Sequence, residues 1–331
     1  MVKPLLAVRD LTTEFAMPGG LVARAVDGVS LDLYPGETLA LVGESGSGKT
    51  TLALSLLRLI PEPPGRIDPA GRVELDGADI LRWDAKALRR VRGGDLAMIF
   101  QEPGSSLNPV MTVGSQITET VRAHGQPDRR AARRRALELL ADVGISDPDR
   151  RLGQYPHQLS GGMQQRVMIA MALAGNPKVL IADEPTTALD VTIQLQILDL
   201  LSDLQRRLGL AVLLITHDLG LAARVADRVA VMYAGRIAES APAARLFDHP
   251  QHPYTEALLH AVPRIDRDVE RLPVVPGQPP LATHWPTGCR FHPRCGHAWE
   301  RCRGAEPSLL GTDQEHVARC WLVDEPARRA P

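Results

Sequence analysis

A glycine-rich segment near the start of the chain has the residue types and the spacing of a phosphate-binding loop. Its glycines let backbone N–H groups curl around phosphate oxygens, and the N-terminus of a following helix adds a positive dipole end. Lys49 can reach the β- and γ-phosphates, while the hydroxyl of Thr50 can bind the Mg²⁺ that bridges them. The predicted nucleotide-binding residues here are Gly43, Glu44, Ser45, Gly46, Ser47, Gly48, Lys49, Thr50 and Thr51.

The segments on either side of this loop support that interpretation. Thr38 to Val42 is a short apolar run that indicates a buried strand. After Gly48, apolar residues recur with helical spacing as far as Ile60, and Pro61 ends the pattern. The alternative is a glycine-rich turn with a solvent-exposed lysine, but the order strand, loop, helix is the one that a phosphate loop requires.

A pair of carboxylates ends a second apolar run. Val179 to Ala182 indicates a buried strand, and Asp183 and Glu184 follow it directly. Asp183 can hold Mg²⁺ through water, and Glu184 can polarise the attacking water as a general base. An apolar strand ending in Asp-Glu is common and would be structural on its own, so this assignment depends on its combination with the phosphate loop.

Further apolar runs alternate with helical stretches, which is typical of a largely parallel sheet covered by helices. From about 102 to 177 the pattern becomes helical with little strand signal, which predicts a helical insert. The basic run Arg129 to Arg135 within it could bind phosphate, but acidic neighbours favour a solvated helix face. The other expected strands are Leu31–Tyr34, Leu96–Phe100, Ala211–Ile215 and Val229–Met232, and the expected insert helices are Val113–Ala123, Arg129–Ala141 and Gly162–Leu173.

The composition is typical of a globular protein and does not indicate a polyanionic partner. The 331 residues are 44% hydrophobic and 23% charged, and the formal net charge is −1. That balance gives no long-range field to recruit nucleic acid or anionic lipid. No apolar run reaches the roughly 18 residues that span a bilayer, and the N-terminus lacks the pattern of a secretory signal. We therefore expect a cytoplasmic protein that binds no nucleic acid.

The segment Leu159-Ser160-Gly161-Gly162-Met163-Gln164-Gln165-Arg166 resembles the signature motif of ABC-type ATPases. Ser160 and Gly162 would begin a helix whose N-terminus can bind an anion. The phosphate loop of this chain, however, already binds the γ-phosphate of its own nucleotide. The resemblance implies that two subunits pair head to tail. Each signature, through Ser160, Gly161, Gly162 and Gln164, then closes over the ATP held by the other subunit's phosphate loop.

The remaining motifs of that family follow in the expected order. Gln101 comes after an expected strand, the turn Ala188-Leu189-Asp190 comes after Glu184, and His217 follows another strand. By resemblance, Gln101 senses Mg²⁺ and the attacking water, Asp190 signals across the dimer, and His217 contacts the γ-phosphate. Phe15 is a candidate for stacking on adenine, with a core phenylalanine as the alternative.

The C-terminal part resembles one branch of the family. His252-Pro253-Tyr254-Thr255 with Val262-Pro263-Arg264, and later Pro293-Arg294-Cys295, are similar to the oligopeptide and dipeptide permease ATP-binding subunits. Nickel and some sugar importers share this tail. We expect an ABC ATP-binding domain over 1–262, with a mostly parallel α/β core, an antiparallel β edge and the helical insert, and a C-terminal extension over 263–331.

All four cysteines lie in that extension, separated by five, six and seventeen residues. A reducing cytosol disfavours disulfides, and four thiolates suit zinc or an iron–sulfur cluster. Some members of the resembled family carry a four-iron cluster on matching cysteines, so a [4Fe-4S] cluster is expected, with Zn²⁺ or free thiols as alternatives. His292 and His297 could substitute as ligands. The expected cluster ligands are Cys289, Cys295, Cys302 and Cys320.

The resemblance implies an ATPase of the translocase class that drives import of oligopeptides or dipeptides. The catalytic set would be Lys49, Gln101, Glu184 and His217, with Mg²⁺ held through Thr50, Gln101 and Asp183. The implied partners are a second, different ATPase subunit, two membrane-spanning permease subunits and an extracytoplasmic binding protein, which place the chain peripherally at the cytoplasmic face of the inner membrane.

Nickel or an oligosaccharide is the alternative solute. A soluble ABC ATPase not tied to transport, and a regulatory metal-binding protein with a vestigial nucleotide site, are the alternatives from other classes.

Overall fold

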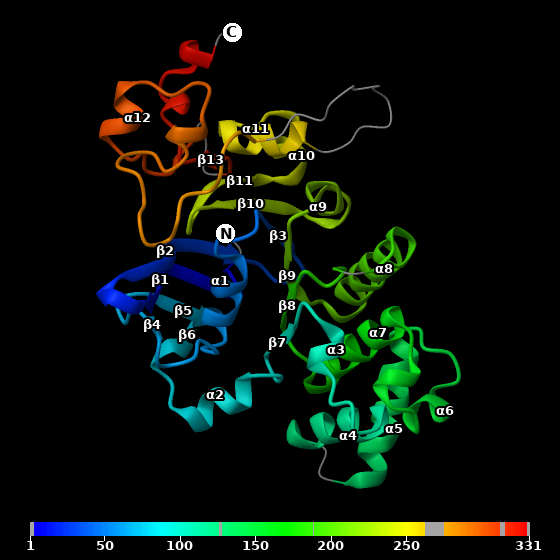
Figure 1. The fold of residues 1–331 in the computed structure, drawn as a ribbon. Coiled ribbons are helices and arrows are strands. Elements are labelled where there is room, and N and C mark those ends of the chain that lie inside the picture. Colours follow the sequence, from blue (N-terminus) through cyan, green and yellow to red (C-terminus); the bar gives the residue numbers. More distant parts are fainter. Residues whose placement is uncertain (1–2, 126–127, 188, 262–274, 312–314, 330–331) are drawn as a thin grey trace. The chain divides into compact units, whose positions relative to one another are not determined.

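The fold comes from a computed structural model, which describes residues 3–125, 128–187, 189–261, 275–311 and 315–329 (Figure 1). The chain divides into two compact units. The first contains Met1–Leu6, Leu33–Glu37 and Arg82–Ile215, and the second contains Ala7–Asp32, Thr38–Leu81 and Thr216–Pro331. Among the described residues, every helix is too short or too polar to cross a bilayer.

The first unit contains three parallel strands. They are β7 (Leu96–Ile99), β8 (Val179–Asp183) and β9 (Ala211–Thr216). Leu96 pairs with Val179, and Val179 pairs in turn with Ala211. Every residue of β8 and β9 is buried, as expected for parallel strands covered on both faces. The sequence-based strands in this part of the chain are confirmed to within a residue.

Helices make up the rest of the first unit, and in Figure 1 the insert helices α4 to α7 gather together. Thr112 and Asp128 cap the N-termini of α4 and α5 through their side chains. The described residues between 102 and 177 contain helices and no strand. The helices are α2 (Ala85–Val91), α3 (Pro103–Ser106), α4 (Val113–Ala123), α5 (Arg129–Asp142), α6 (Pro148–Leu152), α7 (Gly161–Ala172) and α8 (Val191–Leu208).

The basic run lies on α5 and pairs locally. Arg133 contacts Asp149 at 3.1 Å and Arg135 contacts Glu138 at 3.2 Å; the side chains are solvent-exposed except that of Arg135, which is partly buried. Exposed pairs of this kind contribute about 0–1 kcal/mol each. These contacts agree with the solvated helix face that we expected.

The second unit contains two sheets. In one, β3 (Thr38–Val42) runs parallel to β10 (Arg228–Tyr233), and β10 pairs antiparallel with β11 (Arg236–Pro242). The strands β13 (Val317–Ala318) and β12 (Leu310–Gly311) extend this sheet from β11. The other sheet has the order β2-β1-β5-β6, with β4 paired to β1. Its strands are β1 (Leu6–Ala16), β2 (Val22–Leu33), β4 (Gly65–Ile67), β5 (Arg72–Leu75) and β6 (Ala78–Asp79).

Helices flank these sheets and join the C-terminal residues to them. Both α10 and α11 contact β11. A predicted helix running to Ile60 was too long, because α1 ends at Leu56 and Arg58 takes a positive φ of 50° that no helix continues. The helices are α1 (Lys49–Leu56), α9 (Leu219–Val225), α10 (Ala243–Asp248), α11 (Pro253–His260) and α12 (Glu300–Gly304).

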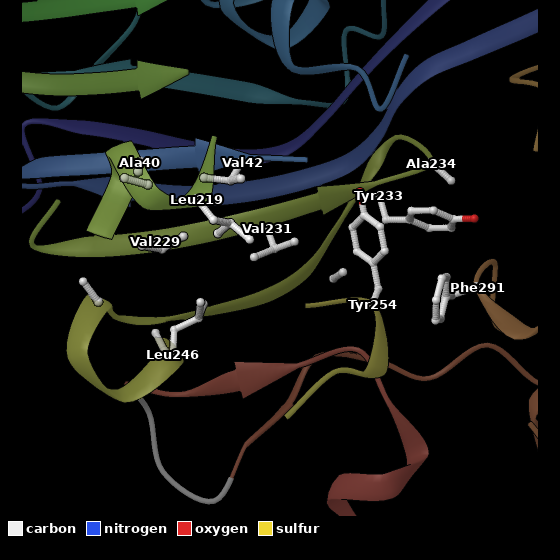
Figure 2. Packing of buried hydrophobic residues seen from close by; sticks show 14 residues of the cluster. Ala40, Val42, Leu219, Val229, Val231, Tyr233, Ala234, Leu246, Tyr254 and Phe291 are labelled. Carbon is white, nitrogen blue, oxygen red and sulfur yellow. The ribbon is translucent and has the colours of Figure 1, made fainter. Parts of the chain in front are cut away.

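A buried aromatic cluster connects the C-terminal residues to β10 (Figure 2). The Tyr233 ring lies 4.5 Å from that of Tyr254 and 5.3 Å from that of Phe291, measured between centroids. Tyr254 and Phe291 are 5.4 Å apart. Such pairs add about 0.5–1.5 kcal/mol each beyond their buried area. The segment around Phe291 therefore shares a hydrophobic core with β10, the strand that flanks β3.

Candidate nucleotide site

The phosphate loop lies between β3 and α1, as predicted, and its glycines are required by the backbone geometry. A Cβ on Gly43 would lie 2.2 Å from the carbonyl oxygen of Met232, and one on Gly48 would lie 2.2 Å from that of Ala25. Gly48 and Gly46 also have φ values of 106° and 78°. Close approach of another backbone segment and a positive φ are two conditions that strongly favour glycine. The glycines of the sequence pattern are therefore needed for the conformation of this loop, which is not an ordinary exposed turn.

The polar groups of the loop are arranged for an anionic ligand. Lys49 is 5% exposed, and its Nζ donates to the carbonyl oxygens of Gly43 at 2.7 Å and Glu44 at 3.0 Å. Thr50 is exposed in the first turn of α1. The hydroxyl of Ser47 is buried with no hydrogen-bond partner among the described atoms. A buried cation and an unpaired hydroxyl at a helix start fit the phosphate oxygens of ATP.

The loop is also held from outside. The Gly235 amide donates to the carbonyl oxygen of Ser47 at 2.9 Å, and the Glu44 amide donates to the Tyr254 hydroxyl at 2.9 Å. Arg294 binds the Glu44 carboxylate. Sequence reasoning missed Tyr254 and Arg294 as contacts of this loop. Both stand in motifs that carried the family resemblance, but nothing in their spacing from the loop indicated contact.

In the first unit, the structure brings Gln101 and Glu184 together. The Gln101 Nε2 donates to Glu184 Oε2 at 3.0 Å, and the Thr187 hydroxyl donates to the same oxygen at 2.8 Å. Glu184 follows β8 with a positive φ of 46°, a conformation that costs about 1–3 kcal/mol in a residue other than glycine. Its amide donates to the carbonyl oxygen of Ile215 at 2.9 Å. The carboxylate is thus oriented by two donors at the end of a buried strand, while Asp183 is 1% exposed.

The signature residues begin α7 and pack on α8. Ser160 is the N-cap of α7, with its Oγ 3.4 Å from the Met163 amide. A Cβ on Gly162 would lie 2.8 Å from Ile193 Cγ2 of α8, so this position favours glycine. Gln164 Nε2 donates to the carbonyl oxygens of Pro156 and Leu159 at 2.9 and 3.3 Å. Gln164 therefore stabilises the turn before α7.

Three further predicted residues have clear places in the fold. Asp190 caps α8, accepting from the Ile193 amide at 3.0 Å. Its neighbour Ala188, part of the same predicted turn, lies outside the described residues, as does Val262-Pro263-Arg264. His217 is exposed directly after β9, and Phe15 is half-buried on β1 opposite Gly65 of β4.

The four cysteines line one cavity in the second unit. Each is a free thiol. Burial, with smaller contributions from the neighbouring cysteines, raises the pKa of Cys289 to about 11 and that of Cys320 to about 12. Within the described ranges, no three histidine, cysteine or acidic side chains are placed to hold a metal ion. The predicted iron–sulfur cluster, and zinc as its alternative, are not supported by this arrangement.

Comparison with known proteins decides the family. The family described as "ABC transporter" matches residues 26–187, and the one described as "Oligopeptide/dipeptide transporter, C-terminal region" matches 238–302. A relative from Brucella abortus (strain 2308) is 50% identical over 317 residues, covering 96% of this chain and 94% of its own. A second, from Brucella melitensis biotype 1, is 50% identical over 329 residues, covering 96% and 97%. The chain belongs to the ABC transporter family.

The fold of this ABC family member is that of solved ATP-binding cassettes. A dimeric cassette in a post-hydrolysis state bound to ADP and Pi is 30% identical, with a TM-score of 0.63 over 72% of this chain and 98% of that one. The protein cbiO1 from Clostridium perfringens, part of an ABC transporter complex, is 28% identical, with a TM-score of 0.63 over 74% and 91%. The expected α/β fold and ATPase class are confirmed, and ATP is the expected nucleotide.

Proposed function

We propose that this chain hydrolyses ATP to drive the import of oligopeptides or dipeptides through a membrane transporter. The observation that carries this proposal is the presence, in one chain, of the ABC region and the oligopeptide/dipeptide transporter C-terminal region. The two Brucella relatives add support, because both are named "Putative peptide import ATP-binding protein". Such a function requires partners that cross the membrane.

The residues have distinct roles in this proposal. Lys49 and the loop amides bind the β- and γ-phosphates, while Thr50, Asp183 and Gln101 hold the Mg²⁺ that accompanies ATP. Glu184 accepts a proton from the attacking water, with Gln101 orienting its carboxylate at 3.0 Å. His217 contacts the γ-phosphate, and Phe15 is proposed to stack on adenine.

The assembly follows from the signature motif. Ser160, Gly161, Gly162 and Gln164 are proposed to complete the nucleotide site of a second, different ATPase subunit, and Asp190 is proposed to signal between the two. A dimer is supported by the dimeric ATP-binding cassette that resembles this chain. Two permease subunits and an extracytoplasmic binding protein complete the transporter, so the chain is proposed to lie at the cytoplasmic face of the membrane. The ATP-binding domain is proposed to end at residue 262 and the C-terminal extension to begin at 263, a boundary that lies outside the described residues.

Uptake of labelled solutes by proteoliposomes of the assembled transporter tests this proposal. With ATP inside and binding protein outside, we expect oligopeptide or dipeptide accumulation, and a Lys49→Ala variant of this chain should abolish it. An exposed lysine elsewhere provides the control: Lys178→Ala should transport normally. Uptake of nickel or an oligosaccharide, without uptake of peptides, would overturn the assignment of peptides as the substrate. Nucleotide hydrolysis that never requires the membrane partners would instead favour the soluble ATPase.

The iron–sulfur cluster remains a separate hypothesis. Its support is that four thiols line one cavity, and the arrangement of those thiols is the observation against it. Iron and sulfide analysis of the anaerobically purified full chain, with a visible spectrum, tests it. Stoichiometric iron and sulfide that disappear in Cys289→Ser and Cys302→Ser variants would establish the cluster. Zinc would establish the alternative metal, and a metal-free protein would remove both.

A further inference from the structure

The C-terminal residues make a direct, charged contact with the phosphate loop. Arg294 Nη1 lies 2.7 Å from Glu44 Oε2, and Nη2 lies 2.9 Å from Glu44 Oε1, so both carboxylate oxygens are bound by one guanidinium. The Arg294 side chain is only 4% exposed. Its hydrogen bond to Glu44 is the main cause that raises the pKa of Arg294 above its usual range. A buried, two-point pair of this kind is among the stronger polar contacts in proteins.

The same loop residue is held at its backbone by Tyr254. The Glu44 amide donates to the Tyr254 hydroxyl at 2.9 Å, and Tyr254 is fully buried. Its ring packs against Tyr233 and Phe291 (Figure 2). The turn before it is fixed as well, because Glu239 Oε2 accepts from the His252 amide at 3.0 Å and the His252 ring caps α11. The hydroxyl that meets the loop therefore has little freedom to move.

Glu44 is the second residue of the phosphate loop and shares its carbonyl with the loop lysine. Lys49 Nζ donates to the Gly43 and Glu44 carbonyl oxygens, so the position of Glu44 helps to set the position of the ammonium. The Glu44 carboxylate is also an anion in a segment that must accept phosphates. Left unpaired, it would repel them, because like charges at close range disfavour binding.

We propose that Arg294 and Tyr254 are positioning residues for ATP binding, acting through Glu44. Arg294 neutralises the Glu44 carboxylate and turns it away from the phosphates, while Tyr254 fixes the loop backbone beside Gly43. The C-terminal region thereby holds the phosphate loop in its binding conformation. This inference rests on the proposed function, since it assumes that the loop binds ATP.

A double-variant experiment on the full chain tests the electrostatic part. The Kd for Mg-ATP, measured by titration calorimetry, should rise about tenfold in Arg294→Met, which corresponds to about 1.4 kcal/mol. Adding Glu44→Gln should recover most of that loss, because the unpaired carboxylate is gone. A contact that only held the fold together would show no such rescue. Arg294→Lys should fall between, since a lysine cannot bind both oxygens at once.

Further variants keep the result interpretable. Tyr254→Phe removes only the hydroxyl and should weaken ATP binding about threefold by leaving the Glu44 amide unpaired. The matched control is Arg328→Met, an arginine of the same region that pairs with Glu325, and it should bind ATP as the wild type does. In the assembled transporter, KM for ATP should rise more than kcat falls. Thermal unfolding of each variant reports on folding, and Arg294→Lys and Tyr254→Phe give the readout where Arg294→Met is unfolded.

Two outcomes separate this inference from the proposed function. A wild-type chain that does not bind ATP would refute the proposed function itself. A wild type that binds ATP, with Arg294→Met binding equally well or with no recovery in the double variant, would overturn only the positioning role of Arg294.

Discussion

The phosphate loop and the four cysteines differ in how far spacing determines structure. In the loop, a Cβ on Gly43 or Gly48 would clash with a backbone oxygen. The glycines in the sequence pattern therefore correspond directly to the backbone geometry. Around the cysteines, four thiols line one cavity without forming a ligand set. The residues between them, notably Arg294, make the specific contacts instead. Spacing is informative where the backbone itself is the binding element, and less so where side chains must converge.

The largest effect should come from the loop glycines. In Gly48→Ala, a Cβ 2.2 Å from the Ala25 oxygen at a φ of 106° should cost about 3 kcal/mol or more and abolish ATP binding. Urea unfolding and ATP titration measure both. Gly296→Ala, at a position with open space beside the cysteines, should change neither. Equal tolerance of alanine at the two positions would show that the loop backbone does not require glycine.

Cys289 and Cys320 should react slowly, as neutral thiols. Burial raises the pKa of Cys289 from 9.0 to about 11 and that of Cys320 to about 12. At pH 8 the thiolate fraction then falls about a hundredfold for Cys289 and about a thousandfold for Cys320, and alkylation depends on the thiolate. Iodoacetamide labelling of these two residues in the metal-free folded chain should therefore be slower than in urea by about those factors, followed residue by residue with mass spectrometry. Rapid labelling of Cys289 or Cys320 in the folded chain would contradict this description.

A smaller effect concerns pH and the buried turn that supports Tyr254. Burial lowers the pKa of His252 from 6.5 to about 4, so the unfolded chain binds a proton that the folded chain excludes. Stability from this group is full above pH 6.5 and is lost as the pH falls toward 4; at pH 5 the loss is about 2 kcal/mol. The lowered pKa of Glu239 acts in the same direction, but only below about 4.5.

A non-titrating variant isolates the His252 effect. His252→Asn keeps a side chain that can cap α11 and has no proton to gain in this range. Urea unfolding at pH 7 and pH 5 should therefore show a smaller drop for His252→Asn than for the wild type. Identical drops in the two proteins would show that His252 does not have the lowered pKa.

Much of the fold follows from periodicity. The strands β3, β7, β8 and β9 and the helices α4, α5 and α7 match the sequence prediction closely, because each is a continuous apolar run or a capped amphipathic stretch. The prediction missed β1, β11, most of β2 and the short strands β4, β5, β6, β12 and β13. The short strands span two to four residues, and their pairing with other strands defines them better than their own composition does.

The candidate site divides in the same way. The pairing of Gln101 with Glu184 and the capping by Ser160 and Asp190 lie on motifs that sequence reasoning had singled out. The contact between Arg294 and Glu44 joins residues 250 positions apart, and no local pattern encodes it. The family resemblance marked the Arg294 segment as characteristic, but only the fold shows what the side chain touches.

ATP hydrolysis by this chain is proposed to drive peptide import. The most direct measurement is the ATP turnover of the transporter reconstituted in proteoliposomes, with and without peptide-loaded binding protein, for the wild type and for Glu184→Gln. Glu138→Gln, an exposed glutamate on α5, is the matched control. We predict that peptide stimulates wild-type turnover, that Glu138→Gln behaves alike, and that Glu184→Gln lowers turnover by a factor on the order of 10² or more. Turnover that ignores peptide, or that survives in Glu184→Gln, would contradict the account.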